Sequence, residues 1–488
     1  MSERLSDIIE SRKQKLLEIK KAGLDPYPPA TERTHTNQEA ILNFESLVDK
    51  EITLVGRIRS FRDMGKLIFA HIEDGTARIQ VLFKADDMGQ DAFKFLLTNT
   101  DIGDFIQVTG QLFLTKTQEK TLKAGSYKLL AKSLLPLPGE HYGLQDEEIR
   151  LRQRYLDILL NPETRNLFIK KNVFWSSFRS FLVDKGFLEL EMPILEAVPG
   201  GAEAEPFITH HKALDRDFYL RISLELPLKK MLVAGYEKVF EIGRIFRNEG
   251  IDTEHLQDYT QMEFYWAYGD FEKLMAFVQE MYQFVIQKTL GTLEASYQGQ
   301  KINWGGQWPR LDYFKLFKKY TGLDLEIAGV KELKAYADEN HIKYEQAHSK
   351  GRLIDLIFKK KIRILPEISQ QPAFLVNQPV ELEPLAKRDP KNPKVVQRMQ
   401  ILACGSELGK GFGELNDPID QRLRFEEQMK LREAGDNEAQ MFDMDYVEAM
   451  EYGMPPCAGF GISERLFAVL MDKSIRECVI FPPMKDSK

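Results

Sequence analysis

The first segment of the chain repeats apolar and charged positions with the period of a helix. Between residues 2 and 22, apolar side chains recur every three or four positions among charged ones, namely Leu5, Ile8, Ile9, Leu16, Leu17 and Ile19. This spacing places the apolar groups on one face of a helix. Gly23 and the Asp25-Pro26 step predict that the helix ends there.

From residue 51 to residue 135 the pattern changes to short apolar runs separated by turn residues. The runs occupy 52–58, 66–72, 77–83, 104–114 and 126–135, with turns indicated at Asp74-Gly75 and Lys123-Ala124-Gly125. Gly56 and Gly110 fall inside runs, as is typical of strands that bend sharply. The pattern predicts a small closed barrel of the OB type, with a β-sandwich fragment as the alternative.

The remainder of the chain mixes strands and helices at irregular intervals. A proline-rich connector ends at Gly139, and residues 145–190 have helical spacing with a break at Asn161-Pro162. Further elements are expected as strands at 219–223, 239–246 and 259–268, a long helix near 271–290 and a helical insertion at 325–362. Strands and helices do not alternate regularly, and neither GxGxxG nor GxxxxGK(S/T) occurs, which argues against a parallel nucleotide-binding sheet.

The composition says more about where the protein works than about which molecules it binds. Of the 488 residues, 43% are hydrophobic and 29% charged, as in globular proteins. No apolar window is long enough to span a membrane, and residues 1–21 lack a signal-peptide pattern, so we expect a cytoplasmic protein without a membrane partner. Cys404, Cys457 and Cys478 lack CxxC spacing, so no zinc site is expected. The net charge of −7 leaves nucleic-acid binding open, because the local field decides it.

Two segments place an arginine at a turn beside apolar elements. FEIGRIFRNEG (240–250) is an apolar strand that ends in a polar turn at Arg247, and TQMEFYW (260–266) is the returning strand. A guanidinium at such a turn can hold a phosphate or carboxylate at two points, with an exposed Arg–Glu pair as the alternative. GFGISERLFAVLMD (459–472) is a glycine-rich turn before a helix that begins near Arg465, and a solvated arginine is the alternative there.

In combination and in this order, the segments resemble a known family. GFLELEMP (186–193), FRNE (246–249) and the Arg465 segment are similar to the three signature motifs of class II aminoacyl-tRNA synthetases. The predicted barrel on the amino side resembles that of the aspartyl, asparaginyl and lysyl branch. Within the branch, the stretches at 199–222, 406–421 and 475–484 look like those of the lysyl enzymes.

The resemblance implies an α+β fold with an N-terminal helical extension (1–50), an OB-fold anticodon-binding domain (51–138), a linker (139–150) and a class II catalytic domain (151–488). The catalytic domain is expected to be built on an antiparallel β-sheet flanked by helices. The implied reaction activates L-lysine with ATP, releases pyrophosphate, and transfers lysine from lysyl-adenylate to the 3′ end of lysine tRNA. Arg247 and Arg465 are expected to carry catalysis by stabilising phosphate charge. Pro193 and the helix before it match the family's dimer-forming motif, which implies a homodimer.

The positions that match the family's lysine pocket are Gly201, Glu225, Arg247, Glu263, Tyr265, Phe412 and Glu414. By the resemblance, Glu414 pairs with the ε-ammonium with help from the Tyr265 hydroxyl, and Glu225 and the Gly201 carbonyl face the α-amino group. A pocket for aspartate or asparagine would need a cation or an amide donor at the side-chain end. The acids therefore favour lysine.

The implied ATP-binding positions are Arg247, Glu249, His255, Tyr259, Glu407 and Arg465. Arg247 is expected on the α-phosphate, Arg465 near the adenine and γ-phosphate, and Tyr259 stacked on the adenine. Glu407 is expected to bind Mg²⁺ that accompanies ATP. Several positions depart from the family pattern. Gln400 replaces a metal-binding glutamate, Lys410 replaces an asparagine beside the substrate carboxylate, and Leu256 lies in an altered loop. Gly459 and Gly461 are offset by one from the usual glycine spacing before Arg465.

For the barrel, the resemblance implies recognition of a uridine-rich anticodon by stacking and by hydrogen bonds to base edges. The expected contacts are Arg57, Arg62, Phe69, Gln80 and Glu119, with core packing as the alternative for Phe69. Three other functions compete for the whole chain. They are an aspartyl or asparaginyl enzyme of the same branch, an enzyme that transfers lysine to a protein, and a catalytically inactive tRNA-binding homologue.

Overall fold

The computed structural model describes residues 3–138, 144–250, 256–345, 348–436 and 439–485. The chain forms two compact units, Met1–Gln145 and Asp146–Lys488, which we call unit 1 and unit 2 and describe separately. The expected linker at 139–150 and the loop position His255 lie partly or wholly outside the described residues.

Unit 1 contains a closed five-stranded barrel in the strand order β1-β2-β3-β5-β4, which confirms the OB-type prediction over the sandwich alternative. Alternate side chains of β2, such as Ile68, Ala70 and Ile72, point inward and are fully buried. The strands are β1 Glu51–Asp63, β2 Leu67–Glu73, β3 Arg78–Lys84, β4 Phe105–Leu114 and β5 Lys120–Ala131. The helices are α1 Glu3–Lys21, α2 Asn37–Leu42, α3 Phe44–Leu47, α4 Ala85–Met88 and α5 Gln90–Asn99.

The fifth strand differs from the prediction, since β5 begins six residues before position 126 and ends four residues before position 135. Lys123-Ala124-Gly125 reads as a turn in sequence, but here it continues the strand through a bulge opposite Thr109 and Gly110. Gly110 is required at this bulge, because a Cβ there would lie 1.9 Å from the carbonyl oxygen of Lys123.

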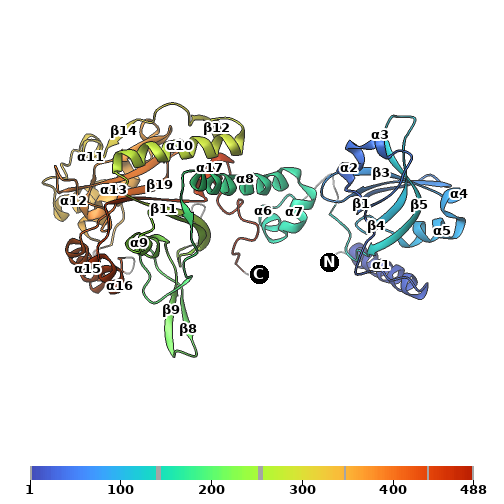
Figure 1. Ribbon diagram of the computed structural model, residues 1–488, viewed down its shortest axis with the longest axis horizontal. Helices are drawn as coiled ribbons and strands as arrows, with labels where there is room; N and C mark the ends of the chain where they lie inside the picture. The colour runs from blue at the N-terminus through green and yellow to red at the C-terminus, as the bar shows by residue number, and fades with distance from the viewer. Residues whose placement is uncertain (1–2, 139–143, 251–255, 346–347, 437–438, 486–488) are drawn as a thin grey trace. The chain divides into compact units, whose positions relative to one another are not determined.

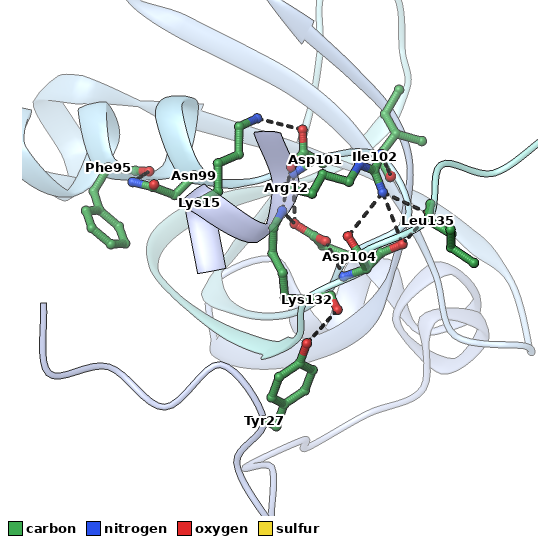
Figure 2. A network of polar contacts seen from close by, with 11 residues as sticks. Arg12, Lys15, Tyr27, Phe95, Asn99, Asp101, Ile102, Asp104, Lys132 and Leu135 are labelled. Atoms are coloured by element: carbon green, nitrogen blue, oxygen red, sulfur yellow. Dashed lines mark hydrogen bonds and ion pairs between the residues drawn. The ribbon is translucent and has the colours of Figure 1, made fainter. Parts of the chain in front are cut away.

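A network of buried charges fastens α1 to the barrel, as Figure 2 shows. The Arg12 guanidinium donates to the backbone carbonyls of Ile102 (2.9 Å) and Leu135 (3.0 Å). Beneath it, the fully buried Lys132 ammonium lies 2.7 Å from Asp104 and 2.5 Å from Asp101. Burial raises the pKa of Asp101, but hydrogen bonds from Lys132 and Lys15 outweigh it and leave that pKa below its usual value.

Unit 2 is built on an eight-stranded sheet in the order β14-β15-β18-β19-β20-β11-β10-β6. All its strand pairs are antiparallel except β14 with β15 and β10 with β6 at the two edges, which confirms the predicted α+β class. The strands are β14 Arg310–Asp312, β15 Ala373–Val376, β18 Arg398–Ala403, β19 Ser406–Gly413, β20 Cys457–Ser463, β11 Asp258–Ala267, β10 Lys238–Phe246 and β6 Leu188–Glu189.

One face of this sheet is packed against long helices. Phe264 of β11 lies 5.3 Å from Phe277 of α10, and Phe460 of β20 lies 6.0 Å from Tyr282, also on α10 (ring centroids). Figure 1 shows α8 and α10 side by side on this face. Because side chains alternate along a strand, the odd-numbered neighbours of these residues point to the opposite face, where the hollow described below opens.

The remaining elements of unit 2 surround the sheet. The helices are α6 Glu147–Arg152, α7 Arg154–Leu160, α8 Pro162–Asp184, α9 Glu225–Val233, α10 Phe271–Leu290, α11 Tyr313–Thr321, α12 Val330–Glu339, α13 Lys350–Lys361, α14 Pro366–Ser369, α15 Pro418–Glu433, α16 Met444–Glu451, α17 Arg465–Leu470 and the 3₁₀ turn Val380–Leu382. The small sheets pair β12 Glu294–Tyr297 with β13 Gln300–Asn303, β16 Gln378–Pro379 with β17 Val395–Val396, and β7 Leu195–Glu196 with β9 Arg216–Leu220 and β8 Ile208–His211. Asn161-Pro162, expected as a break, is where α7 ends and α8 begins. Across the described residues, every helix is too short or too polar to cross a membrane.

We predict that Asp104→Asn destabilises unit 1 by about 3 kcal/mol, because it removes one partner of a fully buried ion pair and leaves Lys132 undercompensated. All four tryptophans lie in unit 2, at positions 175, 266, 304 and 308, so tryptophan fluorescence reports on that unit alone. Urea unfolding followed by circular dichroism should show an earlier transition for unit 1, with the fluorescence transition unmoved.

Lys15→Ala is the graded control, because its pair with Asp101 is partly exposed and should contribute less than about 1 kcal/mol. Equal transitions for Asp104→Asn and the unmodified chain would show that the buried pair does not hold unit 1 together.

Candidate active site

The register of three adjacent strands creates a floor with open space above it. Glu263 of β11 faces Gly461 of β20, and Tyr265 faces Gly459 in the same way. On the other side of β20, Lys410 and Phe412 of β19 face the same two glycines. Glycine is required at 459, because a Cβ there would lie 2.3 Å from the Tyr265 ring and 2.4 Å from Glu414. The two glycines thus leave a shallow space between acidic and aromatic side chains.

Glu263 is buried and fixed by several donors. Its Oε1 accepts hydrogen bonds from the Ser223 hydroxyl (2.8 Å) and the Leu224 backbone N–H (3.1 Å), and its Oε2 accepts one from the Tyr265 hydroxyl (2.7 Å). Burial, followed by the nearby acids, raises the pKa of Tyr265 well above its usual value, so its hydroxyl remains a donor. The Tyr265 hydroxyl therefore donates to Glu263 rather than to Glu414, where it was expected.

Glu225 begins α9 and is packed against Gly201. Gly201 has a φ of +82°, and a Cβ there would lie 2.8 Å from the Glu225 Cβ, so both conformation and space require glycine. Glu225 is only 3% exposed. Its Oε1 lies 2.5 Å from the Nζ of Lys229, one helical turn later.

Glu414 follows β19 and is 1% exposed. Its Oε2 forms an ion pair with the same Lys229, whose ammonium lies between the two carboxylates. The other oxygen, Oε1, is buried without a hydrogen-bond partner. Burial raises the pKa of Glu225 and of Glu414, and the charge of Lys229 opposes that rise.

A hollow of about 530 Å³ lies over this floor, a volume within the usual range for small-molecule sites. Arg247 stands just beyond the end of β10, where its Nε donates to the Ile222 carbonyl at 3.2 Å and its guanidinium lies 5.7 Å from the centroid of the Tyr259 ring. The predicted residues in the wall are Gly201, Glu225, Arg247, Glu249, Tyr259, Glu263, Tyr265, Glu407, Phe412 and Arg465. Glu414 lies behind Gly459, at the edge of this wall.

Gln400, Lys410 and Leu256, which were expected to depart from the family pattern, all line the hollow. Gln400 of β18 pairs in register with Lys410 of β19, and both line the hollow. The Lys410 Nζ lies 3.4 Å from buried Glu383 and 5.3 Å from the centroid of the Phe412 ring. Leu256 is 3% exposed and also lines the wall. Lys410 is therefore held by a carboxylate of the protein itself.

Glu407 and Arg465 meet at one edge of the hollow, where the Arg465 Nη1 approaches the Glu407 backbone carbonyl at 3.5 Å. Among the described residues, no group of three or more His, Cys, Asp or Glu side chains is arranged to hold a metal ion. Mg²⁺ commonly uses one or two carboxylates together with substrate phosphates. Glu407 and Gln400 both line the hollow, and the Glu407 carboxylate fits Mg²⁺ that also binds the phosphates of ATP.

On the barrel of unit 1, the predicted anticodon residues of β1, β2 and β3 lie on the outer face. Arg62 pairs in register with Phe69, a half-buried aromatic on the outer side of β2. The Gln80 amide donates to Glu119 Oε2 at 2.8 Å. Arg57 lies apart, five positions away along β1 from Arg62, where its guanidinium stacks 4.4 Å from the centroid of the Phe105 ring.

Three residues in these sites were not identified from the sequence. Lys229 reads as a surface (i, i+4) partner of Glu225, and Glu383 lies in a loop without a motif. His71 bonds Glu119 Oε1 at 3.0 Å and Ser60 at 2.8 Å. His71 faces Gln80 across β2 and β3, so strand alternation together with the position of Gln80 was the available signal for it.

The comparisons agree with this geometry. Residues 146–485 match the family model for tRNA synthetases class II (D, K and N), and residues 52–130 match that for the OB-fold nucleic acid binding domain. Among similar proteins, the lysine–tRNA ligase of Carboxydothermus hydrogenoformans is 45% identical over 99% of this chain and 98% of its own. That of Bacillus subtilis is 41% identical over 99% of this chain and 98% of its own. With both units matched and full-length relatives at this identity, the chain belongs to the class II tRNA synthetases, in their lysine–tRNA ligase family.

Proposed function

We propose that unit 2 activates lysine with ATP and that the chain then transfers lysine to tRNA. The observation that carries this proposal is a hollow lined by the buried carboxylates Glu225 and Glu263 and by Arg247, with buried Glu414 behind Gly459 at its edge. Buried anions without enough cations are costly, so the hollow favours a positively charged occupant. The relatives' printed name, lysine–tRNA ligase, favours lysine over the aspartyl and asparaginyl alternatives.

Lysine would lie across the glycine floor. Its ε-ammonium would pair with Glu414 Oε1, the buried oxygen that has no hydrogen-bond partner. Its α-ammonium would be held by Glu225, Glu263 and the Gly201 carbonyl, and its alkyl chain would pass Phe412 and the Tyr265 ring. Its carboxylate would face Arg247, which supplies the planar donor fork that such a group fits.

ATP would occupy the part of the hollow between Arg247, Tyr259 and Arg465. The Tyr259 ring offers an aromatic face to the adenine. The two arginines would bind the phosphates, Glu407 would hold Mg²⁺, and Glu249 would line the ATP site. When bound there, Mg²⁺ would neutralise part of the triphosphate charge.

Catalysis would rest on position and charge. The lysine carboxylate would attack the α-phosphorus in line while Arg247 holds the charge that develops, and pyrophosphate would leave. The terminal ribose hydroxyl of tRNA would then attack the carbonyl carbon of the enzyme-bound lysyl-adenylate, releasing AMP. We assign no general base to either step.

Unit 1 would recognise the anticodon through Arg62, Phe69, Gln80 and Glu119, because a half-buried aromatic beside paired polar side chains suits an unstacked base.

We also propose that the protein is a cytoplasmic homodimer, as its resemblance to the family implies. Exposed apolar side chains on and after α8 support a protein partner there, including Ile169 (55% exposed), Leu188 (45%) and Ile194 (43%). The intact barrel argues against transfer of lysine to a protein, and the arginines and carboxylates present in the hollow argue against an inactive homologue.

The amino-acid dependence of ATP–pyrophosphate exchange tests the proposed function, with Glu414→Gln as the decisive variant. We expect exchange with lysine and not with aspartate or asparagine. Glu414→Gln should keep the fold and lose lysine activation by about 100-fold, since the ε-ammonium loses its countercharge. Glu426→Gln, an exposed glutamate on α15, is the matched control and should behave as the unmodified chain. Exchange at the unmodified rate in Glu414→Gln would reject the role of this residue.

For the barrel, we expect Phe69→Ala to lower kcat/KM for tRNA charging by about tenfold or more, because one base loses its stacking surface. Pyrophosphate exchange should be unchanged, since lysine activation takes place in unit 2. Phe69→Tyr keeps the aromatic face and serves as the control in a filter assay for lysyl-tRNA. If Phe69→Ala charged tRNA normally, Phe69 would be a packing residue only.

A further inference from the structure

Lys229 is a lysine of the protein that lies where the pocket for a lysine substrate is proposed. It belongs to α9, and its side chain is fully buried. Its Nζ is 2.5 Å from Glu225 Oε1 and forms an ion pair with Glu414 Oε2. It also lies 5.5 Å from the centroid of the Tyr265 ring. A fully buried ammonium is costly unless paired, so its place between two pocket carboxylates calls for an explanation.

The contacts leave half of each carboxylate for another ligand. Lys229 uses one oxygen of Glu225 and one oxygen of Glu414. Glu414 Oε1 remains buried and without a hydrogen-bond partner. One fixed ammonium therefore sets the separation of the two carboxylates and orients their other oxygens.

The formal charges point the same way. Glu225, Glu263 and Glu414 are three buried carboxylates, and Lys229 is the cation in ion-pair contact with two of them. The cluster is left with two formal negative charges, and free lysine carries two ammonium groups. Without Lys229 the three carboxylates would carry one negative charge more than the two ammonium groups of the substrate can balance. Glu225 and Glu414 would also face each other without a cation between them.

We propose that Lys229 is a positioning and specificity-determining residue for the amino-acid substrate, which holds Glu225 and Glu414 at the separation and charge that two substrate ammonium groups require. The inference rests on the proposed function, since it assigns the same hollow to lysine. Lys229 does not touch the reacting atoms in this proposal and acts only through the two carboxylates.

The surroundings of the cluster leave Lys229 as its nearest cation. Burial raises the pKa of both carboxyl groups, and Lys229 is the largest influence that lowers it again. Tyr446 and Cys457, which also face the cluster, have pKa values raised by burial and stay neutral. The charged and titratable groups that act on the cluster are Glu225 and Lys229 of α9, Glu263 and Tyr265 of β11, Glu383, Lys410 of β19, Glu414, Tyr446 of α16 and Cys457 of β20.

The test is lysine-dependent pyrophosphate exchange by Lys229→Met, measured as a function of pH in the full chain. We expect KM for lysine at neutral pH to rise by at least about tenfold, while KM for ATP changes less than about twofold. Removal of the cation raises the pKa of the carboxyl groups further, so they are protonated at neutral pH and ionise only at higher pH. The acid limb of kcat/KM for lysine should therefore move to higher pH, and alkaline buffer should restore much of the lost affinity.

Lys230→Met is the matched control, because its side chain is 30% exposed and lies 3.8 Å from Asp443. It should keep the lysine KM and the pH profile of the unmodified chain. Lys229→Arg keeps the charge, so it should keep the unmodified pH profile even where its rate falls. This variant decides the question if Lys229→Met does not fold.

Each result of this experiment bears on the proposal. An unmodified lysine KM in Lys229→Met, a parallel rise of both KM values at all pH values, or a shifted acid limb in Lys229→Arg would overturn the role of Lys229. If the unmodified chain shows no lysine-dependent exchange at all, the proposed function fails and takes this inference with it. Lysine-dependent exchange with an unaffected Lys229→Met would reject only the inference.

Discussion

The hollow depends on the register of β10, β11, β20 and β19. In this register Glu263 and Tyr265 share a face with Gly459 and Gly461, while Phe264 and Phe460 pack against α10 on the other face. A one-residue slip would turn the acids into the apolar layer and the phenylalanines into the hollow. The aromatic packing against α10 therefore fixes the face on which the charged groups lie, so core and site are specified by the same alternation.

A second constraint follows, because that face is buried before any ligand arrives. Buried carboxylates must be compensated within the protein. Ser223, the Leu224 N–H and Tyr265 donate to Glu263, and Lys229 serves Glu225 and Glu414. Compensation is complete for Glu263 but partial for Glu414, whose Oε1 has no partner. Folding can tolerate one such oxygen, and a bound cation would satisfy it.

Much of the fold was predictable because local periodicity decides it. The expected helices near 2–22 and 271–290 correspond to α1 and α10, and the barrel strands alternate as the apolar runs indicate. The start of β5 was not predictable, since a bulge opposite Gly110 lets Lys123-Ala124-Gly125 continue a strand despite its turn-like composition. The site was less predictable than the fold. The acids of the hollow could be located by resemblance. Lys229 could not be located in this way, because an (i, i+4) Glu–Lys pair in sequence is typical of an exposed helix face. Only the packing of α9 against β11 and α16 buries it.

The departures at 400 and 410 can be understood from the same requirement for balanced charge. Gln400 and Lys410 are register partners on β18 and β19, so a neutral amide and an ammonium occupy neighbouring points of the wall. Alone, Lys410 would make this part of the wall more positive. Glu383 is 4% exposed and lies 3.4 Å from Lys410, and that cation helps to keep the pKa of Glu383 below its usual value although burial opposes this. The positive charge of Lys410 is thus matched inside the protein by Glu383. A buried carboxylate from a loop thus balances a cation of the sheet within the wall of the hollow.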